Sequence, residues 1–339
     1  MMREKVKELW KLCFDDSEKF IDLYFRMRYS NDINLVIQSG EEVVAALQML
    51  PYPMTFCGQE INTAYISGAC THPDYRNRGV MHELLAQAFA KMLHSGIDVT
   101  TLIPAEPWLF DYYARNGYAP VFCNRTSIYM TCRRSPQPGR FVLKSTGRFE
   151  EEAYRYLDRK LKEREACILH SRADFEVILA DLELTGGKVF TLHREGNIVA
   201  LAVAYPDGKG KWTIGEIVSD SADMDTQLLQ RICEKMKLLS VEVIRPAVDG
   251  EAATPLGMAR IIQVKSVLQL YAAAHPATEL SIALTDEQIS ANNGYYYLNN
   301  GKCMKSAKRL PGSHLALTIG ELTGKIFASL HPYMSLMLN

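Results

Sequence analysis

Residues 69–94, ACTHPDYRNRGVMHELLAQAFAKMLH, contain the pattern that decides the fold of this chain. Gly68 to Thr71 end a segment typical of a strand, and Arg76, Arg78 and Gly79 then form a short basic turn. After the turn, apolar residues recur at helical spacing, namely Val80, Leu84, Leu85, Ala88, Phe89, Met92 and Leu93. The stretch therefore predicts a strand, a basic glycine turn and an amphipathic helix.

The predicted helix begins directly at the basic turn, so its unpaired N–H groups and the positive end of its dipole point at whatever lies in front of it. Arg76 and Arg78 add further positive charge, and we therefore expect a phosphate or pyrophosphate there. A Walker loop would need a Gly-Lys-Ser/Thr ending, and a dinucleotide-binding turn would need three glycines. The stretch has neither.

The remaining pattern, P-x-x-R-x-x-G before an amphipathic helix, resembles the coenzyme A turn of the GNAT acyltransferase superfamily, usually Q/R-x-x-G-x-G/A. Arg76 and Gly79 match, whereas Met81 stands where that family usually has Gly or Ala. A second segment, FDYYARNGYAPVF at 110–122, resembles the family's later F/Y-Y-x-x-x-G-F/Y motif. The two motifs occur in the order that a GNAT fold requires.

Composition limits the alternatives. A chain of 339 residues is too long for one hydrophobic core and predicts more than one domain. Its net charge of -1, from 38 basic and 39 acidic residues, does not indicate that the chain as a whole binds nucleic acid. The eight cysteines form no C-x-x-C pair and lie near no histidine at metal-ligand spacing, which predicts free thiols and no metal. The first 14 residues predict a charged helix rather than a signal peptide, and no apolar run approaches about 18 residues. We expect a cytoplasmic protein without a membrane span.

The periodicity predicts three successive parts. The first has helices within 4–28 that are separated at Asp15–Ser17, a hairpin over 34–54, strands over 60–68 and 97–103, and a short helix between Pro107 and Gly117. A proline-rich break covers 132–140, after which the same succession starts over. The third part predicts a helix over 257–274, strands near 279–286 and 295–306, and a strand running into a helix over 315–330.

The second part has a different turn at the position equivalent to the basic one. After the strand that ends near Val218, the sequence is SDSADMDT, which is acidic and lacks arginine and glycine. Such a turn would repel a pyrophosphate, so this copy is not expected to hold coenzyme A.

The complete layout resembles the enhanced intracellular survival (Eis) family of acetyltransferases. That family has two tandem GNAT-like acyltransferase domains followed by a sterol carrier protein-like domain, an α/β (α+β) fold class. The residues that carry the resemblance are PLGMARIIQV at 255–264, Asp286, Ile289, Asn292 and Gly294, the L-x-I-G-x-L run 317–322, and RNRGVM and RNGYAP. Members tend to have a bulky apolar residue at the position of Met81. The expected domains are 1–133, which is catalytic, 140–255, which is degenerate, and 256–339, which ends in the active site.

The resemblance implies acetyl-CoA as acyl donor and an amine-bearing acceptor. The strand end, the turn and the later helix would bind the coenzyme, through Ala69, Cys70, Thr71, Asn77, Arg78, Gly79, Val80, Met81, His82, Tyr113 and Ala114. Hexamers are implied by the resemblance alone, as a form of homo-oligomer.

Acyl transfer from a thioester to an amine also needs a proton for the departing thiolate. Tyr118 is the expected general acid because it lies just past the helix that flanks the pantetheine arm, and Tyr112 and Tyr113 compete for this role. No internal Asp, Glu or His is an evident base. The resemblance implies instead the C-terminal carboxylate of Asn339, and the apolar chain end HPYMSLMLN would raise its pKa by partial burial.

Two other functions stay open: a non-catalytic scaffold that binds coenzyme A or a lipid, and another tandem-GNAT acyl or aminoacyl transferase. The acceptor also stays open between a small molecule, an antibiotic and a protein lysine. For a cationic amine, Asp15, Asp16, Glu18 and Asp22 are candidate partners.

Overall fold

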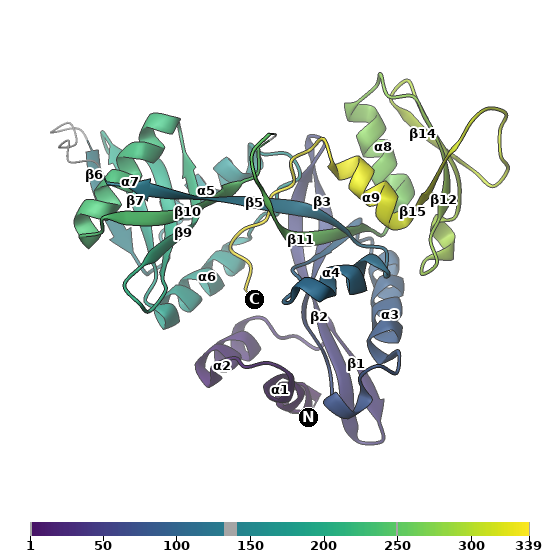
Figure 1. The fold of residues 1–339 in the computed structure, drawn as a ribbon, viewed down its shortest axis with the longest axis horizontal. Helices are drawn as coiled ribbons and strands as arrows, with labels where there is room; N and C mark the ends of the chain where they lie inside the picture. The colour runs from purple at the N-terminus through teal and green to yellow at the C-terminus, as the bar shows by residue number, and fades with distance from the viewer. Residues whose placement is uncertain (1, 132–140, 249, 339) are drawn as a thin grey trace. The chain divides into compact units, whose positions relative to one another are not determined.

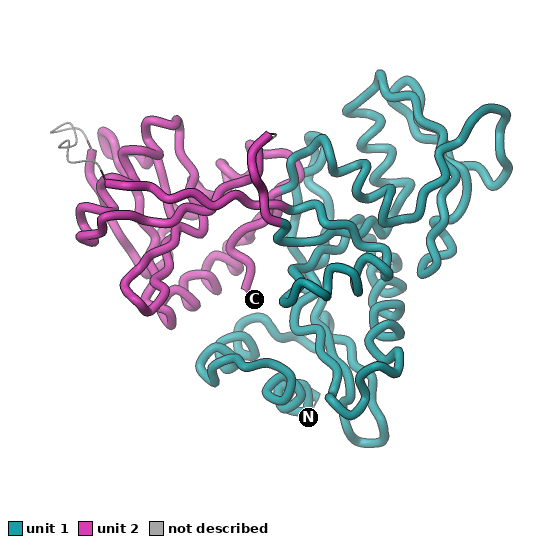
Figure 2. The backbone as a smooth tube through the Cα atoms, in the orientation of Figure 1, with its two compact units in different colours: residues 1–122, 255–332, 339 teal, residues 123–254, 333–338 magenta. Residues whose placement is uncertain are grey.

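The computed structural model describes residues 2–131, 141–248 and 250–338. The chain forms two compact units (Figure 2): unit 1 contains the described residues of 2–122 and 255–332, and unit 2 contains those of 123–254 and 333–338. The predicted proline-rich break at 132–140 lies outside the described residues.

Unit 1 begins with two helices, α1 (Met2–Cys13) and α2 (Glu18–Met27). They separate where predicted, because the Ser17 side chain caps α2 by accepting a hydrogen bond of 3.2 Å from the Phe20 N–H. Their apolar faces form one core cluster that includes Trp10, Tyr24 and Phe25.

The main sheet of unit 1 has the order β1-β2-β3-β4-β11. Its strands are β1 (Asn34–Ser39), β2 (Glu42–Phe56), β3 (Gln59–Thr71), β4 (Val99–Leu102) and β11 (Thr254–Ile261). The predicted hairpin is β1 and β2, which pair antiparallel, and α3 (Val80–His94) connects β3 to the parallel strand β4. On β2, Ala45 packs in the cluster of α3 and its neighbour Ala46 in that of α1 and α2, so helices cover both faces (Figure 1).

β11 corrects one prediction, because residues 257–261 form a strand rather than the start of a helix. The strand pairs antiparallel with β4, with Ala259 opposite Thr101 and Arg260 opposite Thr100, and helix α8 (Val264–Ala274) begins only after it. Residues 258–262 are buried throughout. A strand buried on both faces has no alternation of apolar and polar residues, and periodicity alone cannot distinguish it from a buried helix.

The rest of unit 1 comprises a short 3₁₀ turn η1 (Pro73–Tyr75), helix α4 (Pro107–Ala114) and a second, four-stranded sheet. That sheet has the order β14-β13-β12-β15, with β12 (Leu280–Thr285), β13 (Gly294–Asn299), β14 (Lys302–Ser306) and β15 (Leu315–Thr318). β15 runs into α9 (Ile319–Phe327), as predicted, and η2 (Ser290–Asn292) precedes β13.

The sheet of unit 2 has the order β5-β10-β9-β8-β7-β6. Its strands are β5 (Ala119–Met130), which the chain enters from unit 1, β6 (Phe141–Thr146), β7 (Lys188–Arg194), β8 (Asn197–Pro206), β9 (Trp212–Ser219) and β10 (Ser240–Pro246). Its helices are α5 (Glu151–Lys162), α6 (Arg172–Thr185) and α7 (Ala222–Met236). Each unit therefore contains the same succession of elements: two helices, a hairpin, a strand, a helix and a parallel strand. The fold is mixed α/β, as predicted.

Within the described ranges, every helix is too short or too polar to cross a bilayer.

Candidate functional site

The turn between β3 and α3 contains two residues with left-handed backbone. Asn77 has a φ angle of 59° and Gly79 one of 78°. Only glycine adopts this conformation freely, and asparagine tolerates it better than most residues do. Left-handed residues in such turns bring successive N–H groups to one side, which is the geometry of anion-binding concavities.

The first turn of α3 leaves backbone donors without partners in the part of the chain that the structure describes. Gly79 is the N-cap and provides no side-chain hydrogen bond, and the first intrahelical bond of 3.0 Å runs from the Glu83 N–H to the Gly79 carbonyl. The N–H groups of Val80, Met81 and His82 therefore precede the helical ladder. Together with the helix dipole, they make this end of α3 suitable for an anion.

The two arginines of the turn are exposed, and each has a different contact. Arg76 Nε donates a hydrogen bond of 3.1 Å to the carbonyl of Thr71, which ties the turn to the end of β3. The Arg78 guanidinium lies 5.5 Å from the ring centroid of Tyr75. Both positive charges therefore lie next to the free end of α3.

β3 separates from its parallel neighbour before it ends. Only Thr63, Ala64 and Tyr65 pair with β4, opposite Val99 to Thr101, although β3 continues to Thr71. On the other side, pairing with β2 extends as far as Cys70 and Thr71. Among the described residues, the edge of β3 that faces β4 is thus unpaired over 66–71, which contains the predicted coenzyme contacts Ala69, Cys70 and Thr71.

Asn116 links the two sequence motifs. The His82 ring Nδ1 lies 2.8 Å from Asn116 Oδ1, and Asn116 Nδ2 donates a hydrogen bond of 2.9 Å to the Tyr112 carbonyl. The start of α3 is thereby fixed to the end of α4, where Tyr113 is buried and Ala114 exposed. The sequence motif RNGY includes Asn116, but its spacing gave no sign of this contact.

Tyr118 lies in the core of unit 1. Its side chain is 2% exposed, its hydroxyl lies 3.3 Å from Thr100 Oγ1, and its ring contacts those of Phe89 and Tyr113. Burial raises the pKa of Tyr118, and the hydrogen bond with Thr100 opposes the rise. The hydroxyl therefore keeps its proton at neutral pH, which a proton donor requires.

Tyr113 is the second buried hydroxyl at this position. Its side chain is 7% exposed, and its ring packs edge-on against Tyr112 and Tyr118. Burial raises the pKa of Tyr113 as well. Within residues 2–131, 141–248 and 250–338, no group forms a hydrogen bond with its hydroxyl, so this donor is available to a ligand.

Sequence reasoning missed Arg260, which supports the loop before Tyr118. Its side chain is fully buried, and Nε donates a hydrogen bond of 3.1 Å to the carbonyl of Asn116. At the next residue, a Cβ added to Gly117 would lie 2.6 Å from Ile319 Cγ2, and the φ angle there is 82°. Arg260 and Gly117 therefore position the loop that carries Tyr118.

Most acidic side chains predicted to attract a cationic acceptor already have partners. Asp16 accepts a hydrogen bond of 2.8 Å from Trp10 Nε1, while Glu18 pairs with Lys11 and Asp22 with Lys7. Asp15 is exposed. Asp16, Glu18 and Asp22 are thus paired with side chains of α1 rather than free to bind a cationic acceptor.

The predicted base, the terminal carboxylate of Asn339, lies outside the described residues. The segment before it is fixed within unit 2. Backbone hydrogen bonds of 3.0 Å join Tyr333 to Ala166 and Ile168, and Ser335 Oγ donates one of 2.5 Å to the buried Glu216. The chain is therefore ordered to within four residues of its end.

The equivalent turn of unit 2, between β9 and α7, is occupied by its own side chains. Ser221 caps α7 by accepting from the Met224 N–H, Asp223 and Asp225 lie in the first helical turn, and Asp225 pairs with Arg245. A capped, acidic helix start does not attract a pyrophosphate.

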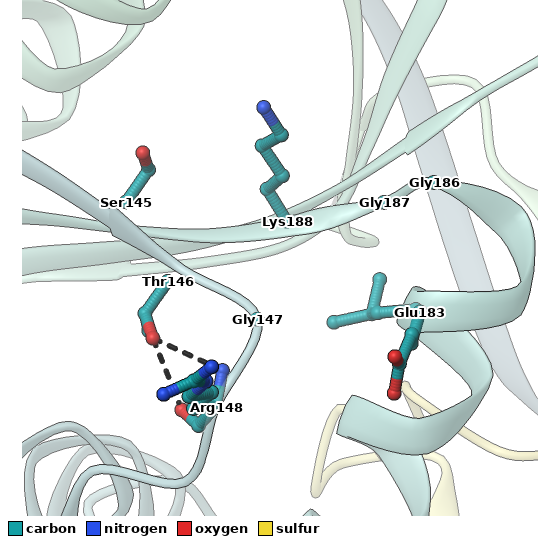
Figure 3. A pocket seen from close by; sticks show the side chains of 9 residues that line it. Ser145, Thr146, Gly147, Arg148, Glu183, Gly186, Gly187 and Lys188 are labelled. Carbon is teal, nitrogen blue, oxygen red and sulfur yellow. Dashed lines mark hydrogen bonds between the residues drawn. The ribbon is translucent and has the colours of Figure 1, made fainter.

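Unit 2 also has a hollow of about 460 Å³ beside the end of α6. Figure 3 shows Thr146, Arg148, Gly187 and Lys188 around it. Lys188 lies in register with Ala204, and Ala204 with Ile214, whereas Ser219, from which the chain enters the α7 turn, lies in register with Ala200. The hollow is therefore at the other end of the sheet and is not the equivalent of the basic turn.

The comparisons with known proteins agree with this geometry. Residues 2–121 match the family model described as the acetyltransferase (GNAT) domain. This part of the chain contains α1 to α4, the basic turn and Tyr118. The N-terminal part is therefore an acetyltransferase domain, and the enzyme class that it indicates is an acyltransferase. A comparison with curated protein sequences gives no match.

Solved structures share the fold over most of the chain. A GCN5-related N-acetyltransferase from Anabaena variabilis has a TM-score of 0.78 at 17% identity, covering 94% of this chain and 86% of that one. One from Kribbella flavida has a TM-score of 0.76 at 16% identity, covering 99% and 95%. Eis1 from Mycobacterium abscessus has a TM-score of 0.73 at 13% identity, covering 96% and 87%. At these identities the similarity is one of fold.

Proposed function

We propose that the protein is an acetyl-CoA-dependent N-acetyltransferase of the Eis type that acts on a primary amine. One observation carries the proposal: the uncapped start of α3, with Arg76 and Arg78 beside it, lies directly after the unpaired edge of β3. A pyrophosphate at the helix and an extended amide-containing arm along the strand suit this arrangement. The catalytic part is the domain predicted over 1–133, and 140–255 and 256–339 are the degenerate and sterol carrier protein-like domains of the proposal.

Acetyl-CoA supplies the thioester, and the chain's residues hold it. The pyrophosphate contacts are assigned to Asn77, Arg78 and the N–H groups of Gly79 to His82. Backbone groups of Ala69, Cys70 and Thr71 are assigned to the pantetheine amides. The carbonyl of Thr71 already accepts hydrogen bonds from Arg76 and Cys13, so its contribution is the smallest of the three. Tyr113 and Ala114 complete the site from α4.

Tyr118 is the proposed general acid, with its hydroxyl hydrogen as the proton for the departing thiolate. A raised pKa keeps this hydroxyl protonated but lowers its tendency to give the proton up. Tyr113 is the alternative donor because its hydroxyl has no partner in the described part of the chain. Tyr118→Phe and Tyr113→Phe each remove one hydroxyl and preserve the ring. Comparing the two variants therefore shows which tyrosine is the proton donor.

The proposed general base is the C-terminal carboxylate of Asn339. The contacts of Tyr333 and Ser335 fix the preceding segment within unit 2, and the reach of the carboxylate to the coenzyme site is part of the proposal. Its ordinary pKa of about 3.5 must rise for it to act as a base near neutral pH.

The decisive experiment measures thioester consumption with a panel of amines and with acetyl-CoA or a long-chain acyl-CoA as donor. Release of free thiol that depends on both acetyl-CoA and an amine is the expected result. Tight coenzyme binding without turnover on any amine would indicate a scaffold. Faster turnover with the long-chain donor would indicate a different acyl transferase.

A further inference from the structure

Two thiols meet in unit 1 where α1 ends against β3. Cys13, the last residue of α1, directs its Sγ at the carbonyl of Thr71 at a distance of 3.4 Å. Cys70 is the preceding residue on β3, and the two thiols are close enough that each shifts the pKa of the other. Both side chains pack in the apolar cluster of α1 and α2. Residues far apart in the sequence thus bring two thiols into the same part of the core, beside the Thr71 carbonyl.

Arg76 converges on the same carbonyl. Its Nε donates a hydrogen bond of 3.1 Å to the Thr71 oxygen that also accepts from Cys13. A guanidinium beside a thiol favours the thiolate, which is the form that reacts with oxidants. The site therefore combines a thiol, a second thiol and a fixed cation.

The two cysteines differ in exposure and in acidity. Cys13 is half-buried, whereas Cys70 is buried. The neighbouring Cys70 thiol and then the Arg76 guanidinium lower the pKa of Cys13, with His72 adding a smaller effect, while burial opposes them. The neighbouring Cys13 thiol, and then burial, raise the pKa of Cys70. Cys13 is thus the accessible nucleophile, and Cys70 is the resolving cysteine.

We propose that Cys13 and Cys70 are a thiol modification site that a peroxide converts into a reversible disulfide. The Cys13 thiolate attacks one peroxide oxygen, an S–O bond forms as the O–O bond breaks, and the departing oxygen takes a proton and leaves as water or an alcohol. The Cys70 thiolate then attacks the Cys13 sulfur, and an S–S bond forms as the S–O bond breaks, releasing a second oxygen as water. The two sulfur atoms give up two electrons, and the peroxide accepts both.

The disulfide would act on the coenzyme site. It joins the end of α1 to β3, removes the Cys13 donor from the Thr71 carbonyl, and alters the position of the strand end that precedes Arg76. This consequence rests on the proposed coenzyme site, whereas formation of the disulfide does not. We expect oxidation to weaken coenzyme A binding by roughly fivefold or more.

The first test is peptide mapping of the full-length protein after treatment with hydrogen peroxide and alkylation of the remaining thiols. The expected product is a peptide pair joined through Cys13 and Cys70, which dithiothreitol separates again. Cys123 is the matched internal control, because it is also half-buried and has no thiol neighbour among the described residues. The absence of the joined pair, with Cys13 and Cys123 alkylated at equal rates, would overturn the proposal.

Single-residue variants distinguish loss of the disulfide chemistry from loss of the fold. Cys13→Ser changes a half-buried residue and is expected to abolish the linked peptide, whereas Cys123→Ser is expected to retain it. In Cys70→Ala, Cys13 is expected to stop at the sulfenic acid and to react with dimedone. A dimedone adduct on Cys123 instead of Cys13 would contradict the assignment of the nucleophile.

Titration of reduced and oxidised protein with coenzyme A distinguishes the two proposals. If the reduced protein fails to bind, the proposed function fails while the mapping result stands. If both forms bind equally although the disulfide has formed, the link between this thiol site and the coenzyme is wrong.

Discussion

Arg260 on β11 and Asp286 just after β12 form an ion pair of 2.7 Å in which neither side chain is exposed to solvent. The remaining polar atoms also have partners. Arg260 donates to the carbonyls of Asn116 and Ile261, and Asp286 accepts from the N–H groups of Gln288 and Ile289 and from Asn292. The pair therefore links the loop before Tyr118 to the C-terminal part of unit 1.

Replacing one partner of this pair is expected to destabilise unit 1 strongly. In Arg260→Met the Asp286 carboxylate loses its buried counter-ion, which costs about 3–5 kcal/mol of unfolding free energy. Urea denaturation measures the loss. The control is Lys11→Met, which removes an exposed pair with Glu18 and is expected to leave the unfolding free energy nearly unchanged. Equal effects of the two variants would show that the buried pair has no special role.

The two tyrosine variants test the general acid. Tyr118→Phe is expected to lower kcat by about 10²–10⁴-fold with little change in the affinity for coenzyme A, because only the proton donor is removed. Tyr113→Phe is the matched control, since it removes a neighbouring buried hydroxyl. Steady-state kinetics and calorimetry are the measurements. A loss of kcat in Tyr113→Phe alone would transfer the role to Tyr113.

Arg78 is expected to contribute directly to coenzyme binding. Arg78→Ala removes a cation whose contact in the structure is the Tyr75 ring, so the fold has little reason to change. Loss of one charge-assisted contact corresponds to roughly tenfold weaker binding, with a smaller dependence on salt. Lys302→Ala, an exposed change on β14, is the control. Equal Kd values for both variants would remove Arg78 from the site.

Glycines 79 and 117 are expected to respond differently to alanine. Both have positive φ, which costs about 1–2 kcal/mol for any residue with a Cβ. At Gly79 the space around an added Cβ is open, but at Gly117 the Cβ would lie 2.6 Å from Ile319. Gly117→Ala should therefore lower the melting temperature by more than Gly79→Ala does. The reverse order would contradict the packing of the loop before Tyr118.

Glu216 gives unit 2 a defined pH dependence. Burial is the main cause that raises the pKa of Glu216, and Arg164 and Ser335 oppose it. The folded state then holds the proton at pH values at which the unfolded chain, with a pKa near 4.5, has released it. Stability from this group is therefore present below that value and is lost as pH rises through the raised pKa.

The matching variant is Glu216→Gln, which cannot titrate. Its stability relative to the natural protein should rise between pH 4.5 and neutrality, as measured by urea unfolding at several pH values. Glu242→Gln, at an exposed position on β10, is the control and should show a flat difference. A flat difference for Glu216→Gln as well would mean that burial does not affect its titration.

Much of the local structure follows from the sequence. The Ser17 cap, the hairpin before β3 and the turn from Arg76 to Gly79 were predicted because each depends on nearby residues and on backbone preference. The prediction was wrong at 257–261, where a strand buried on both faces has the same apolar pattern as a helix.

In the candidate site, too, some features follow from local sequence and others depend on tertiary contacts. The sequence by itself determined that a basic turn precedes an amphipathic helix, since dipole, charge and left-handed backbone are local properties. Only the tertiary structure decided that β3 leaves β4 after Tyr65, that Arg260 supports the loop before Tyr118, and that Cys13 contacts the end of β3 at Thr71. Each of these depends on a pairing between distant segments, which burial of apolar surface enforces and which local spacing does not encode.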